Sequence, residues 1–567
     1  MSADRMKVVL CWHMHQPQYC DMASGEYQLP WTYLHAMKDY VDMAVLLEEN
    51  ENAKVVVNFA PILLEQIDDY VQQLKSFKQH GAAITDPLLS ALASTTFPHH
   101  QVQRLELIRQ CVRANAERLI KPHPQFQRLA LMATLLEEDQ KVLHYLGDQY
   151  LTDILVWYHL VWLAESAHRN DKRIQALVAK GQDFTLSDRH QLVEIITELI
   201  SSVIPRYRLL AEQGRVELSM NPYAHPIVPL LLDLHSSYDA MPDADMPHAR
   251  QYPGGEARAN WHIEEGIAVF EKHFHQRPQG CWPSEGAVST DTLTLFSQHG
   301  LRWAATGEAV LHNSLSRAER SHEAGQEQGV YRPYQVAGSD TACFFRDDGL
   351  SDLIGFTYSD WHGDDAANNF IEHLQRIADS CDEPGKRVVS IILDGENAWE
   401  HYPNNGYYFL SSLYKQLATH PSLEMTSFSE SLDAGVEVAQ LDSLVAGSWV
   451  YGTFSTWIGD KDKNNAWDLL IEAKRAFDVV MGSKHLAEEE RQQARRQLAL
   501  CEGSDWFWWF GDYNPAEAVS DFEYLFRLHI AHLYGILGVE APEALAHSIA
   551  EGHGDPEGGG SMRRGQN

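Results

Sequence analysis

One run of apolar residues constrains the fold of this 567-residue chain more than any other stretch. Residues 388–393 read Val-Val-Ser-Ile-Ile-Leu, and Asp394, Gly395 and Glu396 follow at once. Strands that are apolar on both faces are typical of parallel sheets that are covered on both sides. The run therefore predicts an α/β fold, in which helices connect parallel strands.

Shorter runs of the same kind recur along the chain. Strands are predicted at residues 6–12, 54–59, 215–219, 278–282, 301–305, 342–346, 353–356 and 423–426. Helical periodicity separates several of them, as in 263–275 and 366–380, and such alternation implies parallel strands with right-handed crossovers. A count of seven or eight strands favours a TIM-like barrel, complete or incomplete, over an open sheet. No glycine-rich phosphate-binding motif follows any strand, which disfavours a nucleotide-binding fold.

The domain plan has three parts. Residues 1–430 are predicted to form the barrel, with a helical insertion at about 62–213, where Val102, Leu105, Ile108 and Val112 recur at helical spacing. The insertion is interpreted as a lid or side wall. Helices at 465–480, 486–501 and 517–537 predict a C-terminal helical domain over residues 431–548. The glycine-rich tail, 549–567, is predicted to be disordered.

Composition limits the partners. The formal charge of −34 argues against nucleic acid and against anionic membranes, and it fits a neutral or cationic substrate. No window approaches the ~20 apolar residues of a membrane span. The seven cysteines lack a CxxC pair, which predicts reduced thiols and no structural zinc. The charged N-terminus resembles no signal peptide, so a cytoplasmic protein is expected. The residues indicate no particular oligomeric state.

Two acidic residues follow predicted strands. Glu285 lies in GCWPSEGAVS, residues 280–289, and Asp394 ends the central apolar run. Two carboxylates with aromatic neighbours are the minimum set for cleaving a glycosidic bond. Desolvation at a strand end would raise the pKa of Asp394, as a proton donor requires. The structural alternatives are a helix N-terminal acid for Glu285 and a helix-capping turn residue for Asp394.

His13 and His15 stand two apart after the first strand. One hypothesis is a metal site of a metal-dependent hydrolase, with further ligands from His225, Asp360 or His362. The other hypothesis uses neutral imidazoles as hydrogen-bond partners of sugar hydroxyls and of a catalytic carboxylate. The spacing does not decide between them.

Further polar and aromatic residues are candidates for substrate contacts. Glu217 is interpreted either as a salt-bridged strand residue or as a group that orients a sugar, and Arg346 could grip hydroxyls. Trp282 and Glu396 are close in the sequence to Glu285 and Asp394, respectively. Fifteen tryptophans are many for this length, and some are expected to be core. The candidates for sugar stacking are Trp361, Trp399, Trp449, Trp457, Trp506, Trp508 and Trp509, of which about half are expected to be packing residues.

Five stretches together resemble glycoside hydrolase family 57, and most closely its amylopullulanase and α-amylase type modules. They are WHMHQP (12–17), GRVELSMNPYAHPIVPLL (214–231), CWPSEGAVS (281–289), LDGENAWEHY (393–402) and SDWFWWFGD (504–512). The resemblance implies an incomplete (β/α)7 barrel followed by a helical domain, acting on α-glucan without a metal or other cofactor. It places the nucleophile on Glu285, the acid/base on Asp394, and two motif histidines on His15 and His225. Looser similarity places Arg346, Gly363, a tryptophan at Trp449 or Trp457, and Asp505 in the cleft.

The mechanism that follows is double displacement. Asp394 protonates the glycosidic oxygen while Glu285 attacks the anomeric carbon, and water or a sugar hydroxyl then releases the glucosyl group. The carboxyl groups are expected about 5–5.5 Å apart, the separation typical of retention. A 4-α-glucanotransferase or branching enzyme would use the same pair, and a metal-dependent deacetylase and a non-catalytic glucan-binding protein are more distant alternatives.

Overall fold

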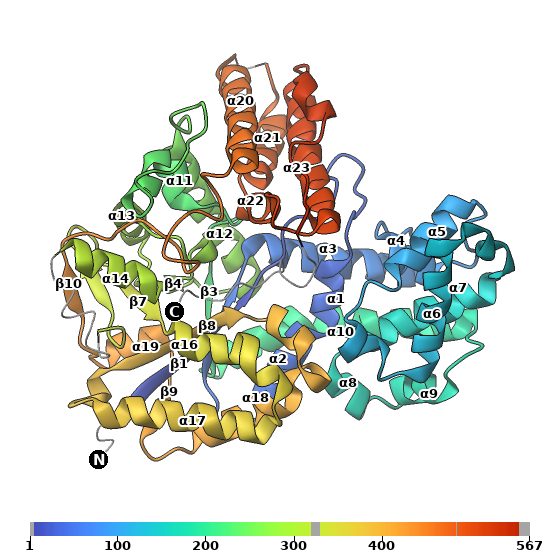
Figure 1. Cartoon of the computed structure of the whole chain (residues 1–567), viewed down its shortest axis with the longest axis horizontal. Coiled ribbons are helices and arrows are strands. Elements are labelled where there is room, and N and C mark those ends of the chain that lie inside the picture. Colours follow the sequence, from blue (N-terminus) through green and yellow to red (C-terminus); the bar gives the residue numbers. More distant parts are fainter. Residues whose placement is uncertain (1–4, 319–328, 484, 555–567) are drawn as a thin grey trace.

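The structure, a computed structural model, describes residues 5–318, 329–483 and 485–554 (Figure 1). Seven parallel strands form a closed barrel, and one bridge between β7 and β8, Arg346 to Ser390, completes the ring. This confirms the predicted (β/α)7 barrel. In order around the ring, the strands are β1 (Met6–Met14), β2 (Val55–Phe59), β3 (Val216–Met220), β4 (Gly280–Cys281), β5 (Trp303–Gly307), β7 (Ala342–Arg346) and β8 (Val388–Asp394).

Three short strands extend the sheet. The strand β6 (Tyr334–Val336) pairs antiparallel with β7, and β10 (Ala439–Leu441) pairs parallel with β6. The strand β9 (Leu423–Met425) runs parallel to the beginning of β1. Because β10 lies beyond residue 430, the sheet continues past the predicted end of the barrel domain.

The barrel is closed at the amino ends of its strands. Inward side chains such as Cys11, Val56 and Ile392 are fully buried there. The short helix α19 (Phe428–Asp433) covers this end, and the Phe428 ring lies 4.4 Å from that of Trp303. Among the described residues, the barrel therefore opens at the carboxyl ends of its strands.

The prediction of a strand at residues 353–356 was wrong. The helix α16 (Asp348–Asp352) leads directly into a π-helical turn, η5 (Leu353–Thr357). The Asp347 side chain accepts a hydrogen bond from Leu350 N at 2.7 Å and caps α16. This cap begins a helix after β7, and the apolar run that resembled a strand continues it.

The insertion between β2 and β3 is helical, and Figure 1 shows α4 to α9 as a lobe beside the barrel. The long helices α3 and α10 pack against each other and connect this lobe to the barrel. The elements are α3 (Pro61–His80), α4 (Pro87–Ala93), α5 (Gln101–Gln110), η1 (Ala116–Ile120), α6 (Pro124–Glu138), η2 (Gln140–Tyr145), α7 (Asp148–Val161), α8 (Glu165–Asn170), α9 (Lys172–Lys180) and α10 (Leu186–Glu212).

The remaining barrel helices cover the sheet from outside. They are α1 (Trp31–Met37), α2 (Asp39–Glu49), α11 (Val228–Leu232), α12 (Gly255–Phe274), α13 (Thr290–Gln298), α14 (Glu308–Arg317), α17 (Gly363–Ser380) and α18 (Tyr407–Ala418). Short helical turns complete the loops: η3 (Leu234–Asp239), η4 (Ser284–Gly286), η6 (Tyr358–Asp360), η7 (Pro384–Lys386), η8 (Asn397–His401) and η9 (Pro403–Gly406).

Four helices follow the barrel and stand together at the top of Figure 1: α20 (Lys461–Ser483), α21 (Glu488–Cys501), α22 (Ser504–Trp509) and α23 (Ala516–Leu537). A last turn, η10, covers Glu543–Ala546. In the tail predicted to be disordered, His553 N and Gly554 N hydrogen-bond to the loop before α23, while residues 555–567 lie outside the described part.

Two further expectations concern the whole chain. All seven cysteines are unpaired and buried, as the sequence predicted. Within the described ranges, every helix is too short or too polar to cross a bilayer.

Candidate active site

A cavity of about 280 Å³ opens at the carboxyl ends of the barrel strands. Three parts of the chain surround it. The barrel contributes the histidines and acids, the C-terminal helices contribute Asp505 and Asp521, and the insertion contributes Arg113. Of the predicted site residues, those that line this cavity are His13, His15, His225, Trp282, Glu285, Asp394, Glu396, Trp449 and Asp505.

Strand register aligns one layer of polar side chains at this end. Asp394 of β8 lies opposite His13 of β1, His13 lies opposite Asn58 of β2, and Asn58 lies opposite Ser219 of β3. In parallel strands, residues in register project at the same height around a barrel. The layer therefore forms the floor of the cavity, just above the apolar barrel interior.

Glu285 follows β4 in the tight turn η4. Its backbone is left-handed, with φ 57°, a conformation that is uncommon for residues other than glycine and that clusters at functional sites. Gly286 is also left-handed, and a Cβ there would lie 2.9 Å from the Trp282 ring. The turn aims Glu285 into the cavity, where Trp449 Nε1 donates to its Oε2 at 3.3 Å.

Burial raises the pKa of both candidate acids. The pKa of Glu285 rises to about 8, because the side chain is desolvated and because Asp505 and Asp394 repel its charge. Burial also raises the pKa of Asp394 to about 6, although a hydrogen bond from Asn397 opposes this rise. The two carboxyl groups interact electrostatically, so the pair as a whole releases two protons in this range.

A hydrogen-bonded chain leads from the barrel floor to Glu285. His13 Nδ1 lies 2.7 Å from Asn58 Oδ1, and His13 Nε2 lies 3.2 Å from His225 Nε2. His225 Nδ1 lies 2.8 Å from Ser504 Oγ, which in turn lies 3.2 Å from Glu285 Oε1. Burial lowers the pKa of His13 to about 3 and that of His225 well below its ordinary value, so both rings are neutral.

The Ser504 hydroxyl can serve either protonation state of Glu285. When Glu285 is ionised, the hydroxyl donates to the carboxylate at Oε1. When Glu285 is protonated, the carboxyl donates to the hydroxyl, which then donates to His225. The chain thus supports a glutamate that gains and loses a proton.

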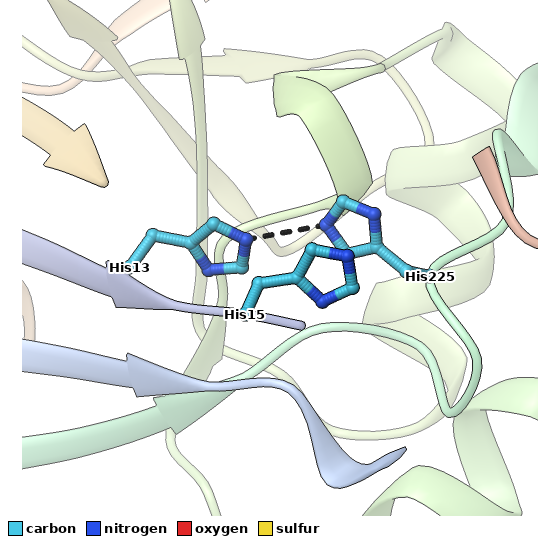
Figure 2. A group of neighbouring side chains, drawn as sticks. All are labelled: His13, His15 and His225. Atoms are coloured by element: carbon cyan, nitrogen blue, oxygen red, sulfur yellow. Dashed lines mark hydrogen bonds between the residues drawn. The ribbon is translucent and has the colours of Figure 1, made fainter. Parts of the chain in front are cut away.

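The three histidines place their ligand nitrogens within 4.8 Å of one another, as a metal site would require. However, their rings are nearly parallel, at 12° to 16°, and His15 is stacked on His225 with centroids 3.8 Å apart (Figure 2). A ring nitrogen binds a metal in the plane of its ring, so stacked rings direct their lone pairs along separate planes. This arrangement favours hydrogen bonding over metal binding.

Glu396 and Asp505 hold His15 from two sides. His15 N donates to Glu396 Oε1 at 3.2 Å, and His15 Nε2 lies 2.8 Å from Asp505 Oδ1. Glu396 is buried and also accepts hydrogen bonds from Gln16 and Tyr40. Glu396 thus holds the His15 backbone from the buried side, while Asp505 lies nearer to the open cavity.

Six predicted substrate-binding residues lie outside the cavity lining. Glu217 accepts hydrogen bonds from Trp303 Nε1 and Ser429 at the closed end of the barrel. Arg346 is buried and bonded to Asp348, Asp352 and Ile392 O, although its guanidinium lies 5.3 Å from the Trp449 ring.

The other four have structural contacts or face solvent. Trp457 and Trp506 are fully buried. Asp360 is exposed and paired with Arg118. Gly363 begins α17, where a Cβ would lie 2.9 Å from Phe409 N. Each has a packing, capping or ion-pair partner that explains its residue type.

Three residues of the site were not among the predicted ones: Asn58, Ser504 and Arg113. Asn58 is a polar residue inside the apolar run Val-Val-Val-Asn-Phe, a pattern that could have marked it. Ser504 begins the tryptophan-rich stretch used for the resemblance. Arg113 lies in the insertion and has no local signal, because only the tertiary fold brings it to the cavity.

The chain belongs to glycosyl hydrolase family 57, whose model matches residues 9–442. Family membership, together with the barrel, supports an enzyme that acts on glycosidic bonds.

Among curated proteins, the chain is similar to a 1,4-α-glucan branching enzyme of Thermococcus kodakarensis, with 22% identity over 346 residues. That alignment covers 57% of this chain but only 46% of the branching enzyme. The solved structure of a family 57 branching enzyme from the same archaeon matches with a TM-score of 0.59 and 15% identity, covering 96% of this chain and 94% of that one. An α-amylase from Thermotoga maritima matches with a TM-score of 0.56 and 15% identity, covering 94% and 93%. At these identities the structures support the shared fold.

Proposed function

We propose that this protein is a retaining α-glucan hydrolase that cleaves α-1,4 bonds in glycogen, starch or maltodextrins, with α-1,6 bonds as a second candidate linkage. The observation that carries the proposal is the placement of Glu285 and Asp394 in one cavity, at the carboxyl ends of β4 and β8, with coupled and raised pKa values. The surrounding acids favour the positive charge that develops on the sugar in the transition state.

In the proposed mechanism, the pair shares one proton. In the free protein the higher pKa of Glu285 keeps this proton on Glu285. The mechanism therefore requires bound glucan to shift the proton to Asp394, which gives it to the glycosidic oxygen while ionised Glu285 attacks the anomeric carbon. Ser504 and Trp449 hydrogen-bond to Glu285 and orient it. Asp394, now ionised, then takes a proton from the water that releases the glucosyl group.

The test is product profiling after incubation with amylose, pullulan and glycogen. We expect new reducing ends from the wild-type protein, and loss of turnover with retained glucan binding in Glu285→Gln and Asp394→Asn. A clearly active Glu285→Gln enzyme would contradict the assignment of the nucleophile.

A branching enzyme or 4-α-glucanotransferase is the second candidate, because a curated relative is a branching enzyme. The same carboxyl pair would then pass the glucosyl group to a sugar hydroxyl in place of water. Branch content and chain-length distribution distinguish the activities. Rearranged chains without new reducing ends would support the transferase.

The metal-dependent alternative is tested separately with a chelator. We expect full activity in EDTA, since the stacked His15 and His225 rings do not converge on one ion. Activity lost in EDTA and restored by a transition metal would favour that alternative.

A further inference from the structure

A second cavity, of about 340 Å³, lies between the helical insertion and the loops after β8. Arg118 and His168 line it from the insertion, and Tyr402 and Asn404 line it from the barrel. Glu400 lines both this cavity and the candidate active site. The two cavities are therefore neighbours along the junction between insertion and barrel.

Arg118 fixes the insertion wall of the second cavity against the barrel. Its Nε donates to His401 O at 2.7 Å, and its Nη2 donates to Ser359 O at 3.2 Å and to Asp360 Oδ1 at 3.1 Å. Two of these three acceptors are backbone carbonyls of the barrel loops. The position of Arg118 therefore depends mainly on the barrel backbone and less on barrel side chains.

Two large aromatic side chains outside the lining of the second cavity face solvent, and each is connected to residues of this junction. Trp361 is 43% exposed and follows Asp360, the partner of Arg118. Tyr408 is 55% exposed, and the Arg169 guanidinium lies 5.5 Å from its ring. The close contact of Gly363 with the Tyr408–Phe409 backbone brings the two aromatic segments together.

The chemistry of the second cavity suits a neutral, hydroxylated polymer. Its lining mixes acidic, basic, imidazole and amide side chains, so no single sign of charge dominates. A glucose ring offers hydroxyls for such groups and C–H faces that pack on aromatic rings.

We propose that the second cavity, with the exposed rings of Trp361 and Tyr408, binds a stretch of α-glucan beyond the segment held at Glu285 and Asp394. The inference rests on the proposed function. It gives the helical insertion a role, as one wall of a remote binding site that recognises long chains.

The test compares long and short substrates in Trp361→Ala, Tyr408→Ala and the double variant. Tyr145→Ala is the matched control for the loss of one exposed ring, since Tyr145 is 88% exposed and lies on η2. Glycogen affinity is measured by affinity electrophoresis in the Glu285→Gln background, and kcat/KM is measured for amylose and for maltotetraose in the active background.

We expect the double variant to lose about tenfold in glycogen affinity and in kcat/KM on amylose, the size of effect typical of losing aromatic contacts. Activity on maltotetraose should stay unchanged, and Trp361→Tyr should restore part of the loss. Unchanged glycogen affinity, or equal losses on both substrates, would overturn the inference alone. A wild-type protein that neither binds nor converts glucan would overturn the proposed function as well.

Discussion

The protonation of Glu285 and Asp394 controls when the proposed pair can work. Below about pH 6 both groups are protonated, so Glu285 cannot attack, and above about pH 8 both are ionised, so no proton donor remains. We expect kcat/KM to follow a bell-shaped pH profile with limbs near these values, because kcat/KM reports the free enzyme. A profile that stays flat from pH 5 to 9, measured with amylose, would contradict the coupled pair.

Ser504 connects Glu285 to the buried histidines, and its hydrogen bond lowers the pKa of the glutamate. We expect Ser504→Ala to reduce kcat/KM by about tenfold, as for the loss of a hydrogen bond to a charged group. The upper limb of the pH profile should move to higher pH. Ser431→Ala is the control, since Ser431 is a buried serine in α19 whose hydroxyl donates to Ser427 O. A reduced rate with an unmoved upper limb would make the role of Ser504 purely structural.

At the scale of elements, Glu502 joins the C-terminal helices to the barrel. Burial alone would raise its pKa, but Arg258 and His262 of α12 together hold the pKa at about 2. We expect Glu502→Gln to lower the free energy of unfolding by about 3–5 kcal/mol, because it leaves buried Arg258 without its counter-ion. Glu488→Gln, at an exposed site on α21, should have little effect. Equal melting temperatures for the two variants would contradict this.

The same contact predicts a pH dependence of stability. The folded pKa of Glu502 lies below its unfolded value of about 4.3, so the contribution is fully present above that value. It is lost as the pH falls toward about 2. Chemical unfolding of wild type and Glu502→Gln should therefore converge at low pH.

The elements with strong patterns were predictable. β8 and β1 follow apolar runs, and the helices of the insertion follow their periodicity. The strands β6 and β10 have three residues each, too few to form a pattern. The run 353–356 was predicted to be a strand because it is apolar, whereas the Asp347 side chain caps a helix just before it and the run continues that helix. The floor of the cavity depends on register, so the alignment of Asn58 with His13 could be seen only in the folded chain.

At the scale of the whole molecule, the cavity needs all three parts of the chain. Arg113 of the insertion donates to Asp521 of α23 at 2.8 Å, and its guanidinium lies 5.5 Å from the Trp31 ring. We expect Arg113→Met to lower kcat/KM on amylose by about tenfold, because the cavity wall loosens. The melting temperature should change little, since a partly exposed pair contributes about 0–1 kcal/mol.

The control for this prediction is Arg206→Met, which removes a similarly exposed pair with Glu48 away from the cavity. Kinetics and thermal unfolding of both variants check it. Equal activity of the two variants would show that the insertion does not shape the site.

The most direct test of double displacement is to trap its covalent intermediate. An α-maltosyl fluoride needs no proton donor to leave, so Asp394→Asn should still form the glucosyl-enzyme but release it slowly. Peptide mass spectrometry is expected to find the maltosyl group on Glu285. A stable adduct on another residue, or β-configured product without any adduct, would contradict the account.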